Sequence, residues 1–372
     1  MTRNAVFVVN KFPDIQHACF FYKNLFRRCV DSAVFFGITG DHCGHLVDDF
    51  FRSERDFNAS YVSRASLLFG KCKLFYGRIK FYRLSTYIEK WWFRILLRRN
   101  FKSIIQKSDF IFIDYTVASM ITRMPDISSL SQVIRSISKQ VIVLPHAVPM
   151  FRESPRFYKP IGESFRNLPS NYVFVVHSEA QKKNLRTINR ECIACRSEWL
   201  DNFMSWGEGQ ATHLLSSPAK ICLAMPGVPR NLEIEESFVD FVMSLGFEVF
   251  IVGHPRLDGS SGFRSVRFDE SPSLNNLRRC DVLICGVSAF QLYAYALGIP
   301  VLIAKELMVP PDFVWCESQI AKPPEVEREQ LIGYLRRLDE LKVQALERQG
   351  QVSKFNARHP RLDEALKLNG YL

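Results

Sequence analysis

The sequence repeats one pattern along most of its length: a short, largely apolar run, a turn, and then a longer stretch of helical character. Strands that are buried on both faces of a parallel sheet read as nearly continuous apolar runs, so this alternation predicts a succession of β-α units. The predicted strands form a first set at 5–9, 32–38, 110–114, 141–145 and 172–176, and a second set at 220–225, 247–252, 265–268, 281–285 and 300–304. The sequence therefore predicts an α/β protein with two Rossmann-like, doubly wound sheets.

The length of 372 residues also favours two domains, because single domains cluster at about 100 to 200 residues. Small and polar residues at 208–220 separate the two sets of strands. We expect an N-terminal domain over 1–215 with a basic helical insertion near 60–105, a second domain over 216–350, and a C-terminal tail or helix over 351–372. A long helix is expected to begin near Pro324, with acidic residues in its first turns.

The composition is that of a folded globular protein, with 47% hydrophobic and 23% charged residues. The start lacks the apolar stretch of a secretory signal, and no run of about 18 uncharged apolar residues occurs, so we expect a cytoplasmic protein. Ten cysteines occur without regular spacing, several of them inside apolar strands, and we interpret them as reduced thiols. Cys192 and Cys195 have the spacing of zinc ligands but no second pair follows, so no metal site is expected.

The positive charge is concentrated in one segment. Between Ser60 and Ser103 there are eleven Lys or Arg residues against the single acid Glu89, which gives this segment +10 of the formal net charge of +11. Within it, 83–102 has an amphipathic helical pattern that includes Trp91 and Trp92. A solvated basic face and attachment to an anionic membrane surface both fit this pattern, and nucleic acid is the weaker alternative. We expect a protein peripheral to the inner face of the cytoplasmic membrane.

Polar residues gather directly after the predicted strands. In an open parallel sheet, ligands bind outside the carboxyl ends of the strands, so these residues are the first candidates for a site. The strand in "FEVFIVGHPR" ends in His254, Pro255 and Arg256. Pro255 stops the strand, and a histidine with an arginine suits a phosphate oxygen; a capping histidine is the structural alternative.

Two further strand ends carry candidate chemistry. Ser288 stands between Gly286 and an apolar helix, where a serine caps the helix and where free amides bind phosphate, so both roles are open. Asp114 ends the strand "FIFID" and is either a base or nucleophile or a solvated strand end. His146 and His177 follow strands as well. The sequence contains neither a Walker motif nor G-x-G-x-x-G, which argues against an NTPase or a dinucleotide oxidoreductase.

These features together resemble a known family. Two doubly wound halves, "HPR" after a strand of the second half, and Ser288 followed by a helix and "LGIPVL" are similar to the GT-B glycosyltransferases of bacterial surface-polysaccharide synthesis. The His-Pro motif followed by a serine motif resembles the sialyl- and Kdo-transferases, which use CMP-activated acidic sugars. "VVHSEAQKKNL" and "CRSEWLDNF" resemble segments of the capsule and lipopolysaccharide Kdo-transferases. The likeness covers about 140–305; Ala147 replaces a frequent glycine, and "GVSAF" has one hydroxyl where a pair is common.

The resemblance implies two Rossmann-like domains facing a cleft, with the acceptor on the first and a nucleotide-sugar donor on the second. It implies transfer of an acidic sugar such as Kdo from a CMP-activated donor to a surface glycan or glycolipid, with no cofactor and no metal. The implied donor-binding residues are His254, Arg256, Ser288, Gly286, Gly227, Gln291, Ser178 and Arg196. The implied catalytic residues are Asp114, His254 and Glu198, with Glu153 and Glu179 as competitors, and the acceptor side holds His146 and His177.

Two other functions remain open at this point. A CDP-polyol phosphotransferase of the teichoic-acid type also resembles "PHAVP" and "GHPR", but it moves a phosphate group rather than a sugar. The third possibility is a non-catalytic protein of the same fold that binds an anionic polymer or a membrane.

Overall fold

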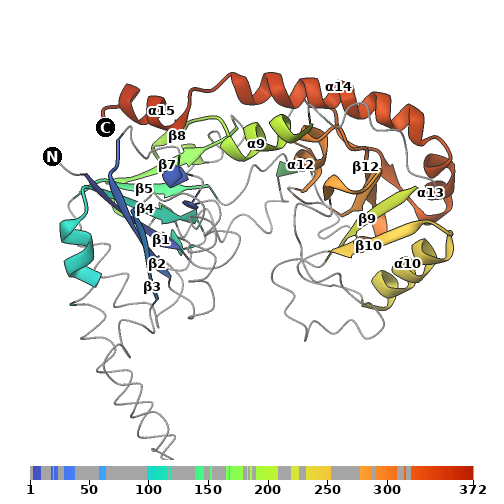
Figure 1. Ribbon diagram of the computed structural model, residues 1–372, viewed down its shortest axis with the longest axis horizontal. Coiled ribbons are helices and arrows are strands. Elements are labelled where there is room, and N and C mark those ends of the chain that lie inside the picture. Colours follow the sequence, from blue (N-terminus) through green and yellow to red (C-terminus); the bar gives the residue numbers. More distant parts are fainter. Residues whose placement is uncertain are drawn as a thin grey trace, which may run out of the picture. The chain divides into compact units, whose positions relative to one another are not determined.

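The chain forms two compact units, each built on its own parallel sheet (Figure 1). Unit 1 comprises Met1–Ala147, Phe157–Cys195 and Pro360–Leu372, and unit 2 comprises Val148–Arg156 and Arg196–His359. The computed structural model describes residues 3–9, 18–19, 21–23, 29–37, 58–63, 99, 101–115, 117–118, 139–145, 151–152, 165–166, 168–178, 182, 185–186, 190–207, 219–225, 232–252, 277–286, 288, 290–307, 314–315 and 320–371.

Unit 1 contains a seven-stranded sheet in the order β3-β2-β1-β4-β5-β7-β8, and every neighbouring pair is parallel. Its strands are β1 (Asn4–Val9), β2 (Ser32–Gly37), β3 (Ala59–Ser63), β4 (Phe110–Asp114), β5 (Val141–Leu144), β7 (Tyr172–Val176) and β8 (Cys192–Ala194). All residues of β5 and β7 are buried, as expected for apolar strands covered on both faces. The five strands expected in this half are confirmed.

Alternate side chains of β1 enter two separate cores of unit 1. Phe7 packs on one face of the sheet, where its ring stacks on Phe35 at 5.0 Å and on Phe112 at 4.7 Å between centroids. Val6 and Val8 pack on the other face. The three stacked rings come from the adjacent strands β2, β1 and β4, so they bind the centre of the sheet together through side chains as well as through backbone hydrogen bonds.

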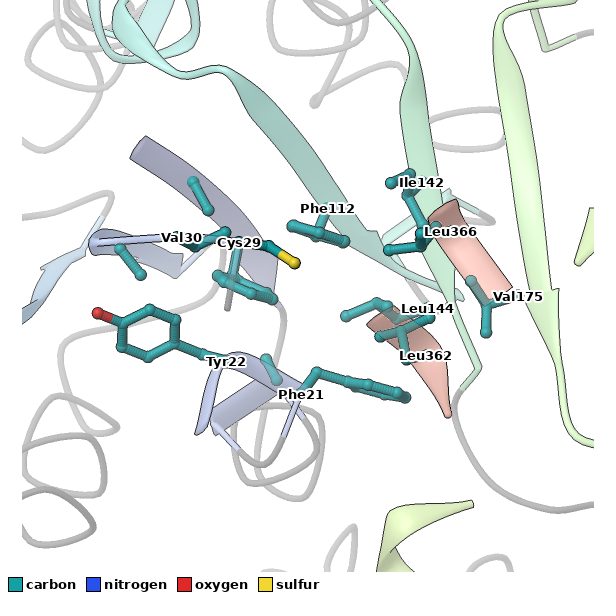
Figure 2. Close-up of a cluster of buried hydrophobic side chains, with 14 of the residues drawn as sticks. Phe21, Tyr22, Cys29, Val30, Phe112, Ile142, Leu144, Val175, Leu362 and Leu366 are labelled. Atoms are coloured by element: carbon teal, nitrogen blue, oxygen red, sulfur yellow. The ribbon is translucent and has the colours of Figure 1, made fainter. Parts of the chain in front are cut away.

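The last helix of the chain, α15 (Leu362–Leu368), completes the first of these cores. Leu362 and Leu366 are fully buried and lie beside Ile142, Leu144 and Val175 of the sheet (Figure 2). The C-terminal segment is therefore part of the N-terminal half of the fold and is not a tail of the second domain. The sequence pattern at 351–372 carried no sign of this return.

Unit 2 contains a five-stranded parallel sheet in the order β10-β9-β11-β12-β14. The strands are β9 (Lys220–Ala224), β10 (Glu248–Val252), β11 (Val282–Cys285), β12 (Val301–Ala304) and β14 (Glu325–Val326). Four of the expected strands are confirmed, and the expected strand at 265–268 lies outside the described residues. A two-stranded antiparallel ribbon joins β6 (Phe151–Arg152) to β13 (Val314–Trp315).

The helices of unit 2 cover its sheet. They are α9 (Glu198–Gly207), α10 (Leu232–Ser244), α12 (Phe290–Ala296), α13 (Arg328–Leu335), α14 (Leu338–Ala357) and the 3-10 turn η2 (Lys305–Leu307). Apolar residues of α10, α13 and the start of α14 pack on one face of the sheet. Helix α12 packs against α9 and α14.

The single long helix expected from Pro324 is wrong. The short strand β14 comes first, and Glu327 and Gln330 then form a reciprocal capping box that starts α13 at Arg328. The helix breaks at Arg337, whose φ of -116° and ψ of 37° are not helical. Leucines of both α13 and α14 pack into the same core, on either side of this break.

The chain crosses between the two units at 147/148, 156/157, 195/196 and 359/360. The expected divisions lay after residues 215 and 350. The structure differs because α9 packs on α12 and α14, which makes it part of unit 2, and because α14 runs on to Ala357 before the chain returns to unit 1.

Only the two ends of the basic segment are described, and its first residues, 60–63, belong to β3. Residues 101–107 are helical, and Phe101 is buried against Phe36 of β2, at 4.8 Å between ring centroids. Arg99 and Lys102 are exposed, and the rest of 83–102 lies outside the described residues. No helix in the described part of the chain is both long enough and apolar enough to span a bilayer.

Candidate functional site

Each sheet has one position where the strand order reverses. In unit 1 the chain runs outward from β1 through β2 to β3, and then returns to place β4 on the other side of β1. In unit 2 the same reversal lies between β9 and β11. Helices leave such a position in opposite directions, so the carboxyl ends of the two central strands border a crevice where ligands bind in doubly wound folds. The residues that end β4 and β11 are therefore well placed to contact a ligand in these crevices.

Asp114 is the residue that ends β4. It pairs in register with Leu144 of β5 and is 3% exposed. A carboxylate at this depth keeps its charge only with polar partners around it, so Asp114 is not the simple solvated strand end that the sequence allowed as an alternative. The structure places this acid at the reversal position of unit 1.

His177 and Ser178 follow β7 and are buried in unit 1. The Nδ1 atom of His177 lies 3.0 Å from the carbonyl oxygen of Cys195, and its ring stacks on Phe21. Because a carbonyl oxygen only accepts, Nδ1 carries the proton and donates it. Ser178 is fully buried, and its carbonyl oxygen accepts from the amide of Lys182. These contacts tie β7 to the end of β8 and give His177 a structural role.

In unit 2 the turn from β11 into α12 is held by internal hydrogen bonds. The Ser288 Oγ atom accepts from the amide of Phe290 at 3.2 Å, which confirms the expected helix cap. The Nε2 atom of Gln291 donates to the carbonyl oxygen of Gly286 at 2.8 Å. Gln291 is 1% exposed, and its Oε1 atom has no hydrogen-bond partner among the described residues. Three of the residues chosen from sequence therefore form one ordered turn.

Gly286 is required in this turn by packing. A Cβ at this position would lie 1.9 Å from the carbonyl oxygen of Leu307 in η2, a distance that no side chain tolerates. The sequence interpretation attributed this glycine to the close approach of a ligand. The contact with Leu307 explains it without one, and the ligand role remains a proposal.

Two strand cysteines, one in each unit, have raised thiol pKa values. Burial raises the pKa of Cys285, the last residue of β11, to about 12, although a hydrogen bond with Gln291 lowers it. Burial also raises the pKa of Cys192 in β8, to about 11. Thiols with such pKa values stay protonated at neutral pH, so these two cysteines are packing residues and not nucleophiles.

The start of α9 is the second polar cluster of unit 2. Ser197 caps the helix, since its Oγ atom accepts from the amide of Leu200 at 3.5 Å. Glu198 begins the helix and is 7% exposed. Arg196 forms an ion pair with Asp201, with 3.3 Å between Nε and Oδ2. The segment "CRSEWLDNF" thus begins with a capped helix and a paired arginine.

Asn356 of α14 is the residue that sequence reasoning missed here. Its side chain hydrogen-bonds both backbone groups of Ser197 and the carboxylate of Asp201. A signal existed, because Asn356 lies on the buried face of α14 with Val352 and Phe355, where an apolar residue is expected. Its partners could not be found from sequence, since 159 positions separate Asn356 from Ser197.

Helices α9 and α12 run side by side in the same direction. Phe203 of α9 stacks on Tyr293 of α12, with 4.8 Å between ring centroids. Further along both helices, Gly207 lies so close to Ala296 that a Cβ on the glycine would be 2.7 Å from the Ala296 carbonyl oxygen. Both helices therefore begin on the same side of unit 2. The start of α9 lies on the side where β11 ends and α12 begins, although the two segments are far apart in sequence.

Several residues chosen from sequence cannot be placed in this arrangement. His146, Glu153, Glu179, Gly227, His254 and Arg256 lie outside the described residues. The strands before Gly227, His254 and Arg256 are described. β9 ends at Ala224 and β10 ends at Val252. Ala224 pairs with Val252 on one side and with Cys285 of β11 on the other. The carboxyl ends of β10, β9 and β11 are thus level. Among the described residues, no group of three or more His, Cys, Asp or Glu is arranged to hold a metal ion.

Comparison with known proteins identifies the fold. No protein-family model and no curated protein matches the chain. Solved structures do match. The chain is similar to the calicheamicin glycosyltransferase CalG4 (TM-score 0.53, 10% identity, covering 100% of this chain and 98% of that one). It is also similar to a UDP-N-acetylglucosamine 2-epimerase (0.53, 11%, 100% and 98%) and to the wall teichoic acid polymerase TagF (0.52, 12%, 99% and 86%).

At these identities the likeness establishes the fold. The chain has two parallel-sheet α/β domains of the GT-B kind, as the sequence predicted, and the strand order in the described part of each sheet agrees with that assignment.

Proposed function

We propose that this protein is a glycosyltransferase that moves a sugar from a nucleotide-activated donor to a glycan or glycolipid acceptor. The observation that carries the proposal is the side of unit 2 where β11 ends. On this side, Ser288 forms an ordered turn and the cation Arg196 stands at the start of the neighbouring helix α9. The fold is also shared with a glycosyltransferase and with an epimerase named for a UDP-sugar. A donor diphosphate or monophosphate needs cations and hydrogen-bond donors at such a strand end.

In this proposal unit 2 binds the nucleotide. The capping bond of Ser288 uses an oxygen lone pair, so its hydroxyl hydrogen remains available to donate to a phosphate oxygen. His254 and Arg256 follow β10 in the sequence and supply further donors to the phosphate. As the bond between the anomeric carbon and the phosphate oxygen breaks, the phosphate gains negative charge, and His254 stabilises it.

The acceptor in this proposal is activated by a carboxylate. The acceptor oxygen attacks the anomeric carbon and passes its proton to a base, for which Asp114 in unit 1 and Glu198 in unit 2 are the two described candidates. Both are buried, at 3% and 7% exposure. His146, near the end of β5 in sequence, is assigned to the acceptor side, and His177 is assigned to hold the loop after β7.

We propose CMP as the nucleotide and an acidic sugar of the Kdo type as the group transferred. The support is the resemblance of "GHPR", "VVHSEAQKKNL" and "CRSEWLDNF" to the corresponding transferase segments. The structural neighbours include a protein named for a UDP-sugar, so a UDP-linked donor is the first competitor. No metal is assigned, because histidine, arginine and amide donors already serve the phosphate.

A phosphotransferase is the second candidate. The likeness to TagF, a wall teichoic acid polymerase, favours it, together with the resemblance of "PHAVP" and "GHPR" to the teichoic-acid type. In such an enzyme the acceptor oxygen would attack the β-phosphorus of a CDP-polyol, the bond from this phosphorus to the bridging oxygen would break, and CMP would leave with that oxygen while the polyol phosphate passes to the acceptor.

The deciding experiment is incubation with CMP-, CDP- and UDP-activated donors in the presence of EDTA, with and without glycan acceptors, followed by analysis of the released nucleotide and the product. The proposal expects CMP release from CMP-Kdo that depends on the acceptor. Release of CMP from a CDP-polyol with phosphate in the product would establish the phosphotransferase. Turnover of none of the donors, or loss of activity that magnesium alone restores, would contradict the respective part of the proposal.

A further inference from the structure

Asn356 lies near the last two of the four places where the chain passes between the two units. The chain leaves unit 1 after Cys195 and returns to it at Pro360. Ser197 is two positions after the first of these crossings, and Asn356 is four positions before the second. Both residues belong to unit 2, so the two connecting segments meet within that unit.

The side-chain carboxamide of Asn356 makes the contact between these segments, through its oxygen and both of its N–H donors. The Oδ1 atom of Asn356 accepts from the amide of Ser197 at 2.7 Å, and its Nδ2 atom donates to the carbonyl oxygen of Ser197 at 2.9 Å. The second Nδ2 hydrogen goes to the Oδ1 atom of Asp201 at 2.8 Å. Asn356 is 1% exposed. Buried hydrogen bonds of this kind are costly to lose, because the polar groups left behind have no water to replace them.

Asp201 extends this contact to a charged side chain. Its other carboxylate oxygen, Oδ2, lies 3.3 Å from the Nε atom of Arg196. Asn356 therefore holds the backbone at the start of α9 directly, and through Asp201 it reaches the ion pair with Arg196, whose Nε atom makes no hydrogen bond among the described residues. Arg196 stands on the side of unit 2 where β11 ends, which is the side proposed to bind the nucleotide.

We propose that Asn356 is a positioning residue that fixes the start of α9, and with it Arg196, relative to the donor site. The part that concerns donor binding rests on the proposed function, whereas the part that concerns the start of α9 does not. No other side chain of this size provides one acceptor and two donors in a plane, and all three are used. A residue chosen only to fill space on the buried face of α14 would be apolar.

Three variants test the proposal. Asn356→Leu keeps the volume and removes every hydrogen bond. Asn356→Asp keeps an acceptor for the amide of Ser197 but, once ionised, has no donor and faces the carboxylate of Asp201. Gln349→Leu is the matched control: Gln349 is also in α14, and its Nε2 atom donates to the carbonyl oxygen of Ala296 at 2.9 Å, away from the connecting segments.

Two readouts are needed for each variant. Amide hydrogen exchange over 197–203 reports the start of α9 in the full chain, with or without any activity. Binding of CMP and of UDP, measured by calorimetry, reports the donor site. Asn356→Leu should accelerate exchange about tenfold or more and should weaken binding of the preferred nucleotide by a similar factor, since the start of α9 loses two buried hydrogen bonds and one half-buried one. Gln349→Leu should leave both within about twofold of the wild type.

Asn356→Asp adds a test that a purely structural role would not pass. Burial and the carboxylate of Asp201 raise the pKa of the introduced acid, while Arg196 and the amide of Ser197 lower it. The protonated acid regains one donor, so exchange relative to wild type at the same pH should fall toward normal as the pH is lowered, and nucleotide affinity should recover with it. This variant also remains informative if Asn356→Leu does not fold.

The outcomes are separable. Unchanged exchange over 197–203 in Asn356→Leu would overturn the proposal. Faster exchange with unchanged nucleotide affinity would overturn the positioning role and leave a structural contact. If the wild type binds neither nucleotide, the proposed function fails, and the exchange measurements alone decide whether Asn356 fixes the start of α9.

Discussion

Single residues around the turn after β11 are constrained mainly by packing, and Gly286 gives the sharpest prediction. In Gly286→Ala the new Cβ meets the Leu307 carbonyl oxygen at 1.9 Å, and both partners are backbone, so neither can move aside cheaply. Overpacking of this kind costs about 3 kcal/mol, which lowers the Tm by about 6–12 °C.

The matched control is Gly350→Ala in α14, where a Cβ has no neighbour within 4 Å. Alanine is the better helix former by about 0.5–1 kcal/mol, so this variant should melt at or above the wild-type temperature. Thermal melting of both variants checks the prediction. A Gly286→Ala protein that melts with the wild type would show that the contact with Leu307 is looser than the structure has it.

The thiol of Cys285 gives a prediction about pH. Its pKa of about 12 in the folded state lies above the value near 9 that it takes when unfolded. Between these values the unfolded chain has lost a proton that the folded chain retains, so the stability contribution is complete below pH 9 and is lost as pH rises toward 12. The loss is about 1.4 kcal/mol per pH unit for one thiol.

Cys285→Ala should therefore flatten the fall of the free energy of unfolding above pH 9, as measured by urea titrations at pH 8, 9, 10 and 10.5. Other groups titrate in this range as well, so the informative quantity is the difference in slope between variant and wild type. Parallel curves for the two proteins would contradict a buried, protonated thiol at this position.

At the scale of elements, α15 belongs to the core of unit 1. Its fully buried Leu366 and its exposed Leu368 provide a matched pair of leucines for substitution. Leu366→Ala empties space beside Ile142 and should destabilise unit 1 by about 2–4 kcal/mol. Leu368 is 78% exposed, so Leu368→Ala should change stability by less than about 0.5 kcal/mol. Urea unfolding followed by circular dichroism measures both. Equal effects would mean that α15 does not pack as described.

The elements show why part of the fold could be predicted from sequence. Strands such as β4 and β7 were located to the residue, because burial on both faces produces an unbroken apolar run. The edge strands β3 and β8 were missed: "ASYVS" is polar and "CIA" is three residues long. The break at Arg337 was missed because the charge pattern is helical on both sides of it.

The candidate site divides in the same way. Ser288 and Asp114 could be found because the residues that follow parallel strands are known from the strands alone. The contact of Asn356 with Ser197 depends on how α14 returns beside α9, and no local pattern encodes it. The packing role of Gly286 was missed, because its neighbour Leu307 comes from η2, about 20 residues later in the chain.

At the scale of the whole molecule, the uneven charge predicts attachment to an anionic membrane. The segment 60–103 carries +10 together with the aromatic residues Trp91 and Trp92. Each basic residue near such a surface contributes about 1 kcal/mol, and salt should weaken the total. Sedimentation with vesicles containing phosphatidylglycerol should pellet the protein at low salt, and neutral vesicles should not. Equal pelleting with both lipids would reject the attachment.

The account as a whole claims that unit 2 stabilises the departing phosphate of a nucleotide-activated donor. The most direct test is donor turnover by His254→Ala, with thermal melting measured on the same sample and with Ser288→Ala beside it. Loss of one preorganised donor to developing charge should lower turnover by roughly a hundredfold or more at an unchanged melting temperature. Ser288→Ala should be milder, because the amides at the start of α12 remain. Near-normal turnover by His254→Ala, or a loss that follows unfolding alone, would contradict the claim.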